Sequence, residues 1–296
     1  MNDPAQGRLF CFGLGYSART LARRLGARGW HVLGTARTAG TCAGLQAAGI
    51  EALPFDGTAP LAPAKHPLAS VTHVLSSVPP DVRGDPVLRH HAEDLAGLSG
   101  LRWVGYLSTT GVYGDRSGEW VDEDSTLRPT GMRGRRRAEA ERAWLALGEK
   151  AGLAVHVFRL AGIYGPGRSA LEALRQGRAK RIRKPGQVFS RIHVDDLAET
   201  LLRSMAAPKA GRIYNVCDDK PAAPEDVVTF AARLLGMPPP PLVAFEDADL
   251  SDMARSFYAD NKRVRNDRIK RELGVVLRYA DYEAGLNAIL AASLGN

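Results

Sequence analysis

The sequence contains few cysteines and no long apolar run. Three of its 296 residues are cysteines, Cys11, Cys42 and Cys217, and their spacing fits no metal-binding motif. Cys11 and Cys217 lie in apolar stretches typical of strands, so we expect buried, reduced thiols. No apolar stretch approaches the roughly 20 residues that cross a bilayer, and residues 1–8 lack the apolar core of a signal peptide. We therefore expect a cytoplasmic protein with no metal site and no membrane partner.

Acidic residues are outnumbered by basic ones. The sequence has 40 Lys and Arg against 32 Asp and Glu, which gives a formal net charge of +8. Such a charge would permit nucleic-acid binding. However, the arginines are scattered, without interleaved aromatic residues or a recognisable binding module. The one dense cluster, Arg-Gly-Arg-Arg-Arg at residues 133–137, fits either a solvated face or an anion site, so no nucleic-acid partner is expected.

Short, continuously apolar segments alternate with helical patterns along most of the chain. The apolar segments include residues 30–35, 50–55, 71–78, 103–108 and 154–160. This alternation is typical of a parallel sheet that is covered on both faces, and 45% hydrophobic residues are enough for a sizeable core.

The predicted fold class is α/β, a doubly wound parallel Rossmann-type sheet with a smaller C-terminal substrate region. We expect the dinucleotide-binding domain to cover residues 1–165 and the substrate-side region to cover residues 166–296. Residues of about 191–217 are expected to return to the first domain.

The clearest motif lies near the start of the chain. An apolar strand ends at Gly13 and a helical pattern follows at once, in the spacing Gly13-x-Gly15-x-x-Ala18. Gly13 permits a sharp turn, Gly15 lets a pyrophosphate approach the main chain, and Ala18 keeps the helix close to the strand. The helix N-terminus offers N–H groups and a partial positive charge to phosphates. We expect a dinucleotide site here, with a purely structural glycine turn as the alternative.

The residue after the second strand bears on the choice of nucleotide. An NAD site has Asp or Glu about 20 residues further on, which binds the ribose 2′-hydroxyl. Here residues 34–38 are Gly-Thr-Ala-Arg-Thr, without a carboxylate. Arg37 can pair with a 2′-phosphate and stack on adenine, although a solvated surface arginine is the alternative. NADP is therefore expected in preference to NAD.

Further motifs follow in a recognisable order. They are Ser-Thr-Thr-Gly-Val-Tyr-Gly at 108–114, Arg-Leu-Ala-Gly-Ile-Tyr-Gly-Pro-Gly at 159–167, Ile-His-Val-Asp-Asp at 192–196 and Tyr-Asn-Val-Cys-Asp-Asp at 214–219. Together with the glycine turn, these motifs resemble the extended short-chain dehydrogenase/reductase superfamily, in its NAD-dependent epimerase/dehydratase group. The resemblance covers nearly the whole chain and implies a nicotinamide cofactor.

The resemblance also implies roles for individual residues. Asp56 would contact the adenine, residues 76–78 would lie at the cofactor ribose, and Thr109 would supply the catalytic hydroxyl. The cofactor-binding residues expected from the turn, from Arg37 and from the resemblance are Gly13, Gly15, Tyr16, Ser17, Ala18, Arg37, Asp56, Ser76, Ser77, Val78, Arg137 and Gly162.

The sequence departs from the family at its catalytic pair. The family has a Tyr-x-x-x-Lys pair after the catalytic hydroxyl, but Arg133 and Arg137 occupy these two positions. The guanidinium of Arg133 stays protonated at any working pH and cannot shuttle protons, whereas Arg137 can still bind the nicotinamide ribose. Four residues apart, the two arginines share a helix face that suits a carboxylate or phosphate. A solvated basic helix end is the alternative.

Three other residues are candidate proton donors. Tyr113, Tyr164 and His193 lie in motifs that the family places at or near its cleft, but a structural role is favoured for each. The family's dehydratases carry Asp-Glu after the catalytic threonine, where this sequence has Thr110-Gly111. Sugar-nucleotide dehydration is therefore not expected.

Two functions remain open. The first is an NADP-dependent oxidoreductase or epimerase-like enzyme on a small anionic substrate, with Thr109, Arg133 and Arg137 as catalytic residues and another proton donor or water. The second is a catalytically silent NADP(H)-binding sensor or regulatory protein. The missing tyrosine favours the second function, whereas the retained Thr109 and the substrate region favour the first, which we prefer. Either a monomer or a homodimer is compatible with the sequence.

Overall fold

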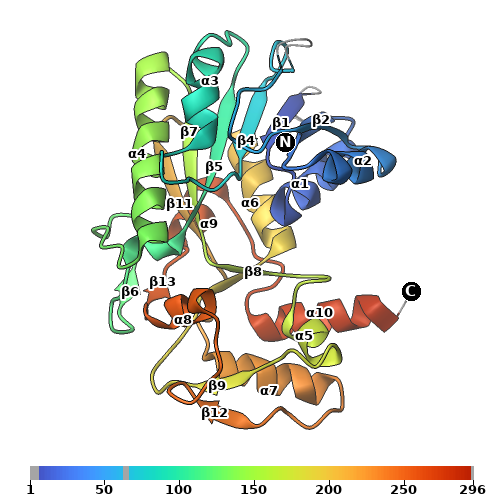
Figure 1. Ribbon diagram of the computed structural model, residues 1–296, viewed down its shortest axis with the longest axis vertical. Helices are drawn as coiled ribbons and strands as arrows, with labels where there is room; N and C mark the ends of the chain where they lie inside the picture. The colour runs from blue at the N-terminus through green and yellow to red at the C-terminus, as the bar shows by residue number, and fades with distance from the viewer. Residues whose placement is uncertain (1–6, 63–66, 295–296) are drawn as a thin grey trace. The chain divides into compact units, whose positions relative to one another are not determined.

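The computed structural model describes residues 7–62 and 67–294 (Figure 1). Residues 1–6, most of the segment in which a signal-peptide core was sought, lie outside the described residues. The central sheet consists of β1 (Arg8–Phe12), β2 (His31–Ala36), β3 (Glu51–Pro54), β4 (His73–Ser76), β5 (Trp103–Thr109), β7 (Val155–Leu160) and β11 (Arg212–Val216).

Seven parallel strands form this sheet in the order β11-β7-β5-β4-β1-β2-β3. In the middle of the sheet, Leu9 pairs with Val32 of β2 on one side and with His73 of β4 on the other. The chain runs outward from β1 to β3, then crosses back to β4 and continues in the opposite direction. Ligands of doubly wound sheets bind at the carboxyl ends of the strands where the order reverses. The predicted fold class is confirmed, and its switch point lies between β1 and β4.

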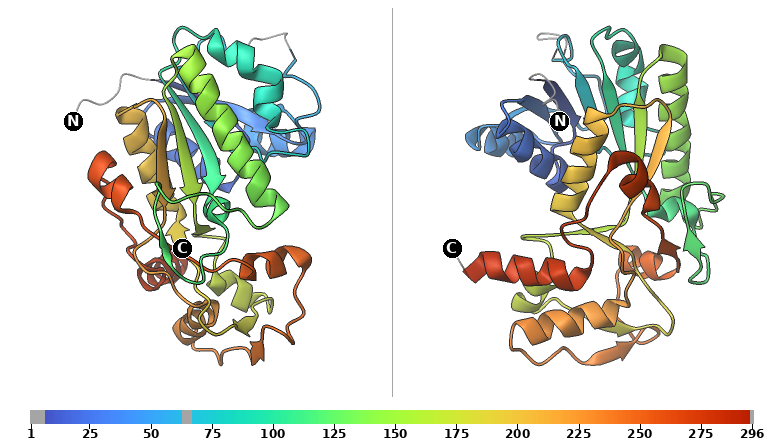
Figure 2. Two further views of the ribbon diagram at one scale, coloured as in Figure 1. Left: turned by 90° about the vertical axis from the view of Figure 1, so that its left-hand side faces the viewer. Right: turned by 180° about the vertical axis from the view of Figure 1, so that it is seen from behind.

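Helices cover both faces of the sheet. Helices α3 (Pro86–Ala96) and α4 (Met132–Ala151) cover one face, and α1 (Tyr16–Gly26) and α6 (Val194–Ala206) cover the other (Figure 1; Figure 2). Helix α2 (Ala39–Ala47) follows β2. Between the sheet and α4, Tyr106 stacks on Trp144 with ring centroids 5.7 Å apart, and both rings are fully buried. Burial of each such side chain stabilises the fold by about 1.5–3 kcal/mol.

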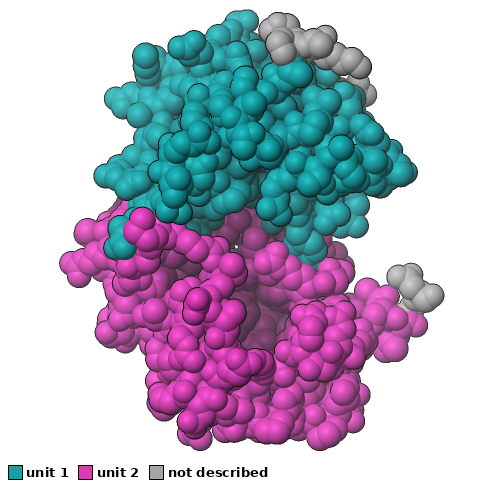
Figure 3. All heavy atoms as spheres, viewed as in Figure 1, with its two compact units in different colours: residues 1–109, 135–159, 198–214 teal, residues 110–134, 160–197, 215–296 magenta. Residues whose placement is uncertain are grey.

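Internal contacts divide the chain into two units, which Figure 3 colours separately. Unit 1 comprises Met1–Thr109, Arg135–Arg159 and Ala198–Tyr214, and unit 2 comprises Thr110–Gly134, Leu160–Leu197 and Asn215–Asn296.

This division differs from the predicted boundary at residues 165/166 in two respects. Residues 110–134, which include the first residues of α4, belong to unit 2, and the segment that returns to unit 1 is Ala198–Tyr214 rather than residues 191–217. The periodicity of a segment indicates its local conformation but not the core on which it packs. The sequence therefore could not show that the loop after β5 belongs to unit 2.

Unit 2 contains short elements around its own core. They are β6 (Trp120–Val121), β8 (Gly162–Tyr164), α5 (Ala170–Arg175), β9 (Arg181–Arg183), β10 (Arg191–His193), α7 (Pro224–Leu234), β12 (Leu242–Ala244), α8 (Asp252–Tyr258), β13 (Arg263–Val264), α9 (Asp267–Leu273) and α10 (Tyr282–Leu294). The core includes Tyr164, Leu171, Ala231 and Leu286. Helices α5 and α8, of six and seven residues, were not predicted, because their sequences show no clear helical period.

Two expectations from composition are tested by the structure. Cys11, Cys42 and Cys217 are buried and free, which confirms the prediction of buried thiols. Within the described ranges, every helix is too short or too polar to cross a bilayer.

Candidate functional site

The turn between β1 and α1 is fastened to two neighbouring strands. Gly13 has φ = 89°, in the left-handed region that favours glycine, and a Cβ atom there would lie 2.6 Å from Ser77 Oγ. The amide of Gly13 donates to Thr35 Oγ1 (2.9 Å), and Ser77 Oγ donates to the carbonyl oxygen of Gly13 (2.7 Å). The turn is therefore held between β2 and the residue that follows β4. The sequence did not reveal this role of Ser77.

Gly15 faces open space. Its backbone is extended (φ = −80°, ψ = −168°), and no described atom beyond its chain neighbours lies within 4 Å of where a Cβ would be. The described first turn of α1 contains no acidic residue, and no side chain caps its N-terminus. In that turn Tyr16 is half-buried, Ser17 is buried, and Ala18 is 1% exposed, so the helix packs closely. The turn and the helix dipole therefore fit a pyrophosphate.

Arg37 and Asp56 follow β2 and β3 and are both exposed. The amide of Leu14 donates to the carbonyl oxygen of Thr35 (2.7 Å), so the end of β2 lies beside the glycine turn. The hydroxyl and the amide of Thr58 donate to Asp56 Oδ1 (2.6 and 2.9 Å) and hold the pKa of that carboxyl below its usual range. Asp56 is thus an ionised hydrogen-bond acceptor after β3, and its expected contact with the adenine stays a prediction.

Residues 76–78 end β4 at the same edge of the sheet. Ser76 is fully buried, and its hydroxyl has no hydrogen-bond partner among the residues that the structure describes. Ser77 and Val78 are half-buried. Because the Ser77 hydroxyl already donates to Gly13, its function in this structure is to position the turn. Contact with a cofactor ribose by these residues stays a prediction.

Arg137 lies on α4 against β5. Its Nη1 atom donates to the carbonyl oxygen of Leu107 (2.8 Å) and to Tyr106 Oη (3.2 Å). Thr109, the expected catalytic hydroxyl, is half-buried at the end of the same strand. Arg137 and the strand that carries Thr109 are therefore connected directly.

A buried ion pair lies one turn further along α4. Glu141 and Arg159 of β7 are joined at 2.9 Å, with side chains that are 2% and 4% exposed, and Ser108 Oγ donates to Glu141. These contacts tie α4 to β5 and β7 and so set the register of Arg137. The pairing was not predicted, although Glu141 lies four residues after Arg137, on the same helix face.

Arg133 and Gly162 belong to unit 2. Arg133 is exposed, and its guanidinium lies 5.7 Å from the centre of the Phe257 ring on α8. Gly162 begins β8 and is exposed, and its amide donates to the carbonyl oxygen of Ser190 (3.1 Å). The expected roles of these two residues toward substrate and cofactor stay predictions.

The three alternative proton donors are engaged within unit 2. Tyr113 Oη donates to Asn215 Oδ1 (2.7 Å), and Tyr164 Oη donates to the carbonyl oxygen of Asp281 (3.2 Å). Burial raises the pKa of Tyr164 and lowers the pKa of His193 to about 4. These surroundings favour structural roles for all three residues. No group of three potential His, Cys, Asp or Glu metal ligands occurs in the described part of the chain.

Comparison with known proteins extends these observations. The model of the NAD dependent epimerase/dehydratase family matches residues 13–217. The chain is similar to Protein YeeZ of Escherichia coli (strain K12), with 29% identity over 291 residues that cover 91% of this chain and 95% of that protein. It is also similar in structure to a conserved protein of unknown function from Silicibacter pomeroyi DSS, with 52% identity, a TM-score of 0.89 and coverage of 97% and 99%.

A more distant similarity concerns the fold alone. MoeE5 in complex with UDP-glucose and NAD has 23% identity and a TM-score of 0.74, and the match covers 97% of this chain and 99% of that one.

Proposed function

The chain belongs to the NAD-dependent epimerase/dehydratase family, and from this premise we propose that it binds NADP(H) and acts as an oxidoreductase or epimerase-like enzyme on a small anionic substrate. The observation that carries the proposal is the turn of Gly13 and Gly15, whose open side faces the N-terminus of α1. MoeE5, which has the same fold, was solved with NAD.

The cofactor would be held mostly by unit 1. Gly13, Gly15 and the N-terminus of α1 receive the pyrophosphate. Arg37 pairs with the 2′-phosphate, and its exposed position at the end of β2 leaves room for that group. Asp56 accepts a hydrogen bond from the adenine. When bound, the nicotinamide supplies or accepts a hydride.

Each of the three expected catalytic residues would have a different role. The Thr109 hydroxyl hydrogen-bonds to a substrate oxygen at the end of β5. Both hydrogen bonds that Arg137 makes within the described residues come from Nη1, so its other nitrogen atoms are available to the ribose. Arg133 neutralises the negative charge of the substrate but transfers no proton, because a guanidinium stays protonated. The proton therefore comes from another donor or from water.

One observation favours a second function. By the sequence resemblance, Arg133 falls at the position of the family's catalytic tyrosine, and its guanidinium lies 5.7 Å from the centre of the Phe257 ring. A protein that kept the cofactor turn but lost proton transfer would serve as an NADP(H)-binding sensor or regulatory protein.

Direct titration and a turnover assay distinguish these functions. The purified chain is titrated with NADPH and then incubated with a metabolite panel and NADP(H), with turnover followed by nicotinamide absorbance. Turnover that a Thr109→Val variant loses while it retains cofactor binding supports the enzyme. Binding without turnover supports the sensor, and a chain that binds neither NADPH nor NADH contradicts both.

A further inference from the structure

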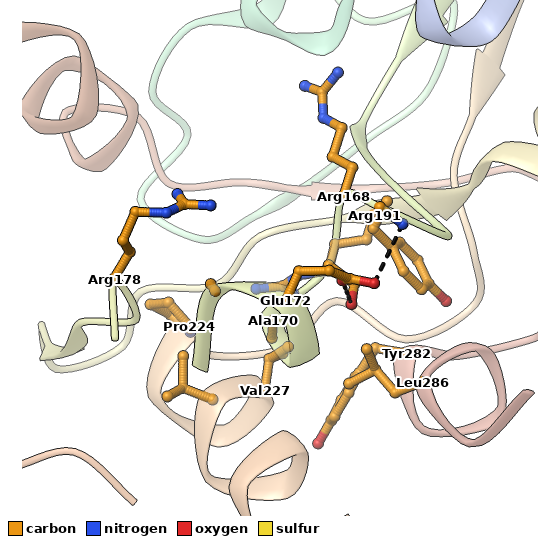
Figure 4. A pocket seen from close by; sticks show the side chains of 14 residues that line it. Arg168, Ala170, Glu172, Arg178, Arg191, Pro224, Val227, Tyr282 and Leu286 are labelled. Carbon is orange, nitrogen blue, oxygen red and sulfur yellow. Dashed lines mark hydrogen bonds between the residues drawn. The ribbon is translucent and has the colours of Figure 1, made fainter. Parts of the chain in front are cut away.

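Unit 2 contains a pocket of about 450 Å³ (Figure 4). This volume lies in the range of small-molecule sites, roughly 300–1,000 Å³. The pocket is lined by α5 and the loops around it, by α7 and by α10, so it lies entirely within one unit. None of its residues was predicted to bind the cofactor, and of those in its lining only Tyr164 was considered as a proton donor, with a structural role favoured.

Arg191 is a cation in the lining of the pocket. Its Nη1 atom donates to the carbonyl oxygens of Phe189 (2.8 Å) and Ala222 (3.1 Å), which fixes the guanidinium in place. Within the described residues its Nε and Nη2 atoms donate to no protein acceptor, and neither is among the buried unsatisfied atoms. Since Arg191 lines the pocket, these two donors are accessible from its space. They form one edge of a planar guanidinium, the geometry that binds a carboxylate through two hydrogen bonds.

A buried carboxyl, Asp218, interacts electrostatically with Arg191 but does not hydrogen-bond to it. Asp218 is 1% exposed; burial raises the pKa of its carboxyl, and the charge of Arg191 acts in the opposite direction. Among the described residues no ion pair joins Asp218 to Arg191, and Asp218 Oδ2 has no hydrogen-bond partner. Within the described part of the chain, Arg191 therefore has no carboxylate bound to its Nε and Nη2 atoms, and an anion in the pocket would supply one.

The other residues that line the pocket form one charged side and one apolar side. Arg168 and Arg178 are exposed and extend to the same side of the pocket in Figure 4. Glu172 also lines the pocket and keeps its negative charge, since the amide of Gly167 (3.2 Å) and Ser169 Oγ donate to its carboxylate. Three arginines of the lining thus stand against one carboxylate. The pocket therefore has a cationic side.

The other side is apolar. Val227 and Val228 come from α7, and Leu286 and the ring of Tyr282 come from α10. Tyr282 and Leu286 are largely buried in the core of unit 2 and contribute only part of their surface to the pocket. A ligand that fits both sides needs an anionic group and an apolar body.

We propose that this pocket binds a small carboxylic acid with an apolar body, its carboxylate on Nε and Nη2 of Arg191 and its body against Val227 and Leu286. Arg168 and Arg178 increase the local concentration of anions at the rim. The proposal does not rest on the proposed function, because binding is measured without a nicotinamide cofactor.

The test is calorimetric titration of the full chain with 4-phenylbutyrate. The uncharged 4-phenylbutyramide and acetate are expected to bind at least about tenfold more weakly. The amide lacks the negative charge, and acetate lacks the apolar body. Phenyl phosphate distinguishes a general anion site from a carboxylate site. If it binds more tightly than phenylbutyrate, the assignment to carboxylic acids is overturned.

Variants then locate the binding site. Arg191→Lys keeps the charge but loses the planar pair of donors, and Arg178→Gln removes a rim charge; both are expected to raise the Kd for phenylbutyrate, the first by about tenfold or more. The matched control is Arg175→Gln, which removes an exposed α5 charge that does not line the pocket.

If Arg191→Lys does not fold, a variant that fills the pocket with a larger side chain tests the proposal instead. Ala173 is half-buried and lines the pocket, so Ala173→Leu should occupy its space and abolish binding while the chain unfolds at an unchanged temperature. The proposal is overturned if wild-type protein does not bind phenylbutyrate at millimolar concentrations, if the amide binds equally well, or if Ala173→Leu binds like the wild type.

Discussion

The guanidinium of Arg133 lies 5.7 Å from the centre of the Phe257 ring. Phe257 is 55% exposed, and at such exposed sites a cation–π contact contributes about 0.5–1 kcal/mol. This energy is small compared with the 1.5–3 kcal/mol of a charge-assisted hydrogen bond. Arg133 can therefore exchange its aromatic neighbour for an anionic ligand at little cost.

A pH profile tests the chemistry at this position. If a metabolite turns over, kcat/KM of the wild type should lack the alkaline limb of a titrating tyrosine, because Arg133 does not change its charge. An Arg133→Tyr/Arg137→Lys double variant should introduce that limb. The assignment of Arg133 and Arg137 to the positions of the family's Tyr and Lys is wrong in either of two cases. The wild type already shows the alkaline limb, or a Phe257→Leu change removes that limb from the double variant.

Arg37→Ala should weaken NADP binding by about 1.5–3 kcal/mol, because a charge-assisted contact to the 2′-phosphate is lost. The affinity for NAD should not change. Both affinities are measured by titration of the purified protein, with Arg28→Ala as the control for loss of an exposed positive charge in unit 1. Equal NADP affinities of the wild type and Arg37→Ala would contradict the assignment of Arg37.

Gly15→Val should abolish nucleotide binding without loss of stability. The backbone at Gly15 is extended, and a Cβ there has no described protein atom within 4 Å beyond its chain neighbours, so the change is expected to displace a ligand rather than protein. Circular dichroism and thermal unfolding check the fold, and titration with NADPH checks binding. A folded variant that binds NADPH normally would show that the phosphates lie elsewhere.

Glu141→Gln should destabilise the chain by about 3–5 kcal/mol, because it leaves the buried guanidinium of Arg159 without a counter-charge. Urea unfolding measures the change. Glu139→Gln, at an exposed position of the same helix, is the control and should have little effect. If Glu141→Gln behaves like the control, then the ion pair does not hold α4 in place.

His156 should make stability depend on pH. Burial lowers its pKa to about 4, and the amide of Lys209 donates to its Nε2 atom (2.8 Å), which requires that atom to be unprotonated. Because the folded pKa lies below the unfolded value of 6.5, the stabilisation is complete above pH 6.5 and is lost as the pH falls toward 4. The loss is on the order of 3 kcal/mol.

The measurement is the free energy of unfolding in urea at several pH values between 7 and 4. His156→Gln should flatten this dependence, whereas His31→Gln, at a ring that is about half exposed, should leave it as in the wild type. An unchanged slope in His156→Gln would mean that other groups account for the acid sensitivity.

The order of strands and helices in unit 1 could be predicted, since each element there is long enough to show its own period. The strands predicted at 103–108 and 154–160 are β5 and β7. In unit 2 the elements are shorter, and α5 and α8 were missed. Helix α5 contacts α7 and α10, whereas Tyr258 of α8 packs in a cluster with Ile182 and Ala248. Such contacts leave no clear period in segments of six and seven residues.

The sequence by itself determined the fold class and the glycine turn, because each depends on residues that are close together in the chain. That Arg133 and Arg137 replace the family's catalytic pair stays a prediction. The tertiary structure decided which distant residues meet. It brought Ser77 to Gly13, and it placed Arg191 and Leu286 around one pocket. These pairs are 64 and 95 residues apart (77 − 13 and 286 − 191). Their contact depends on how two cores bury apolar surface, which no local pattern records.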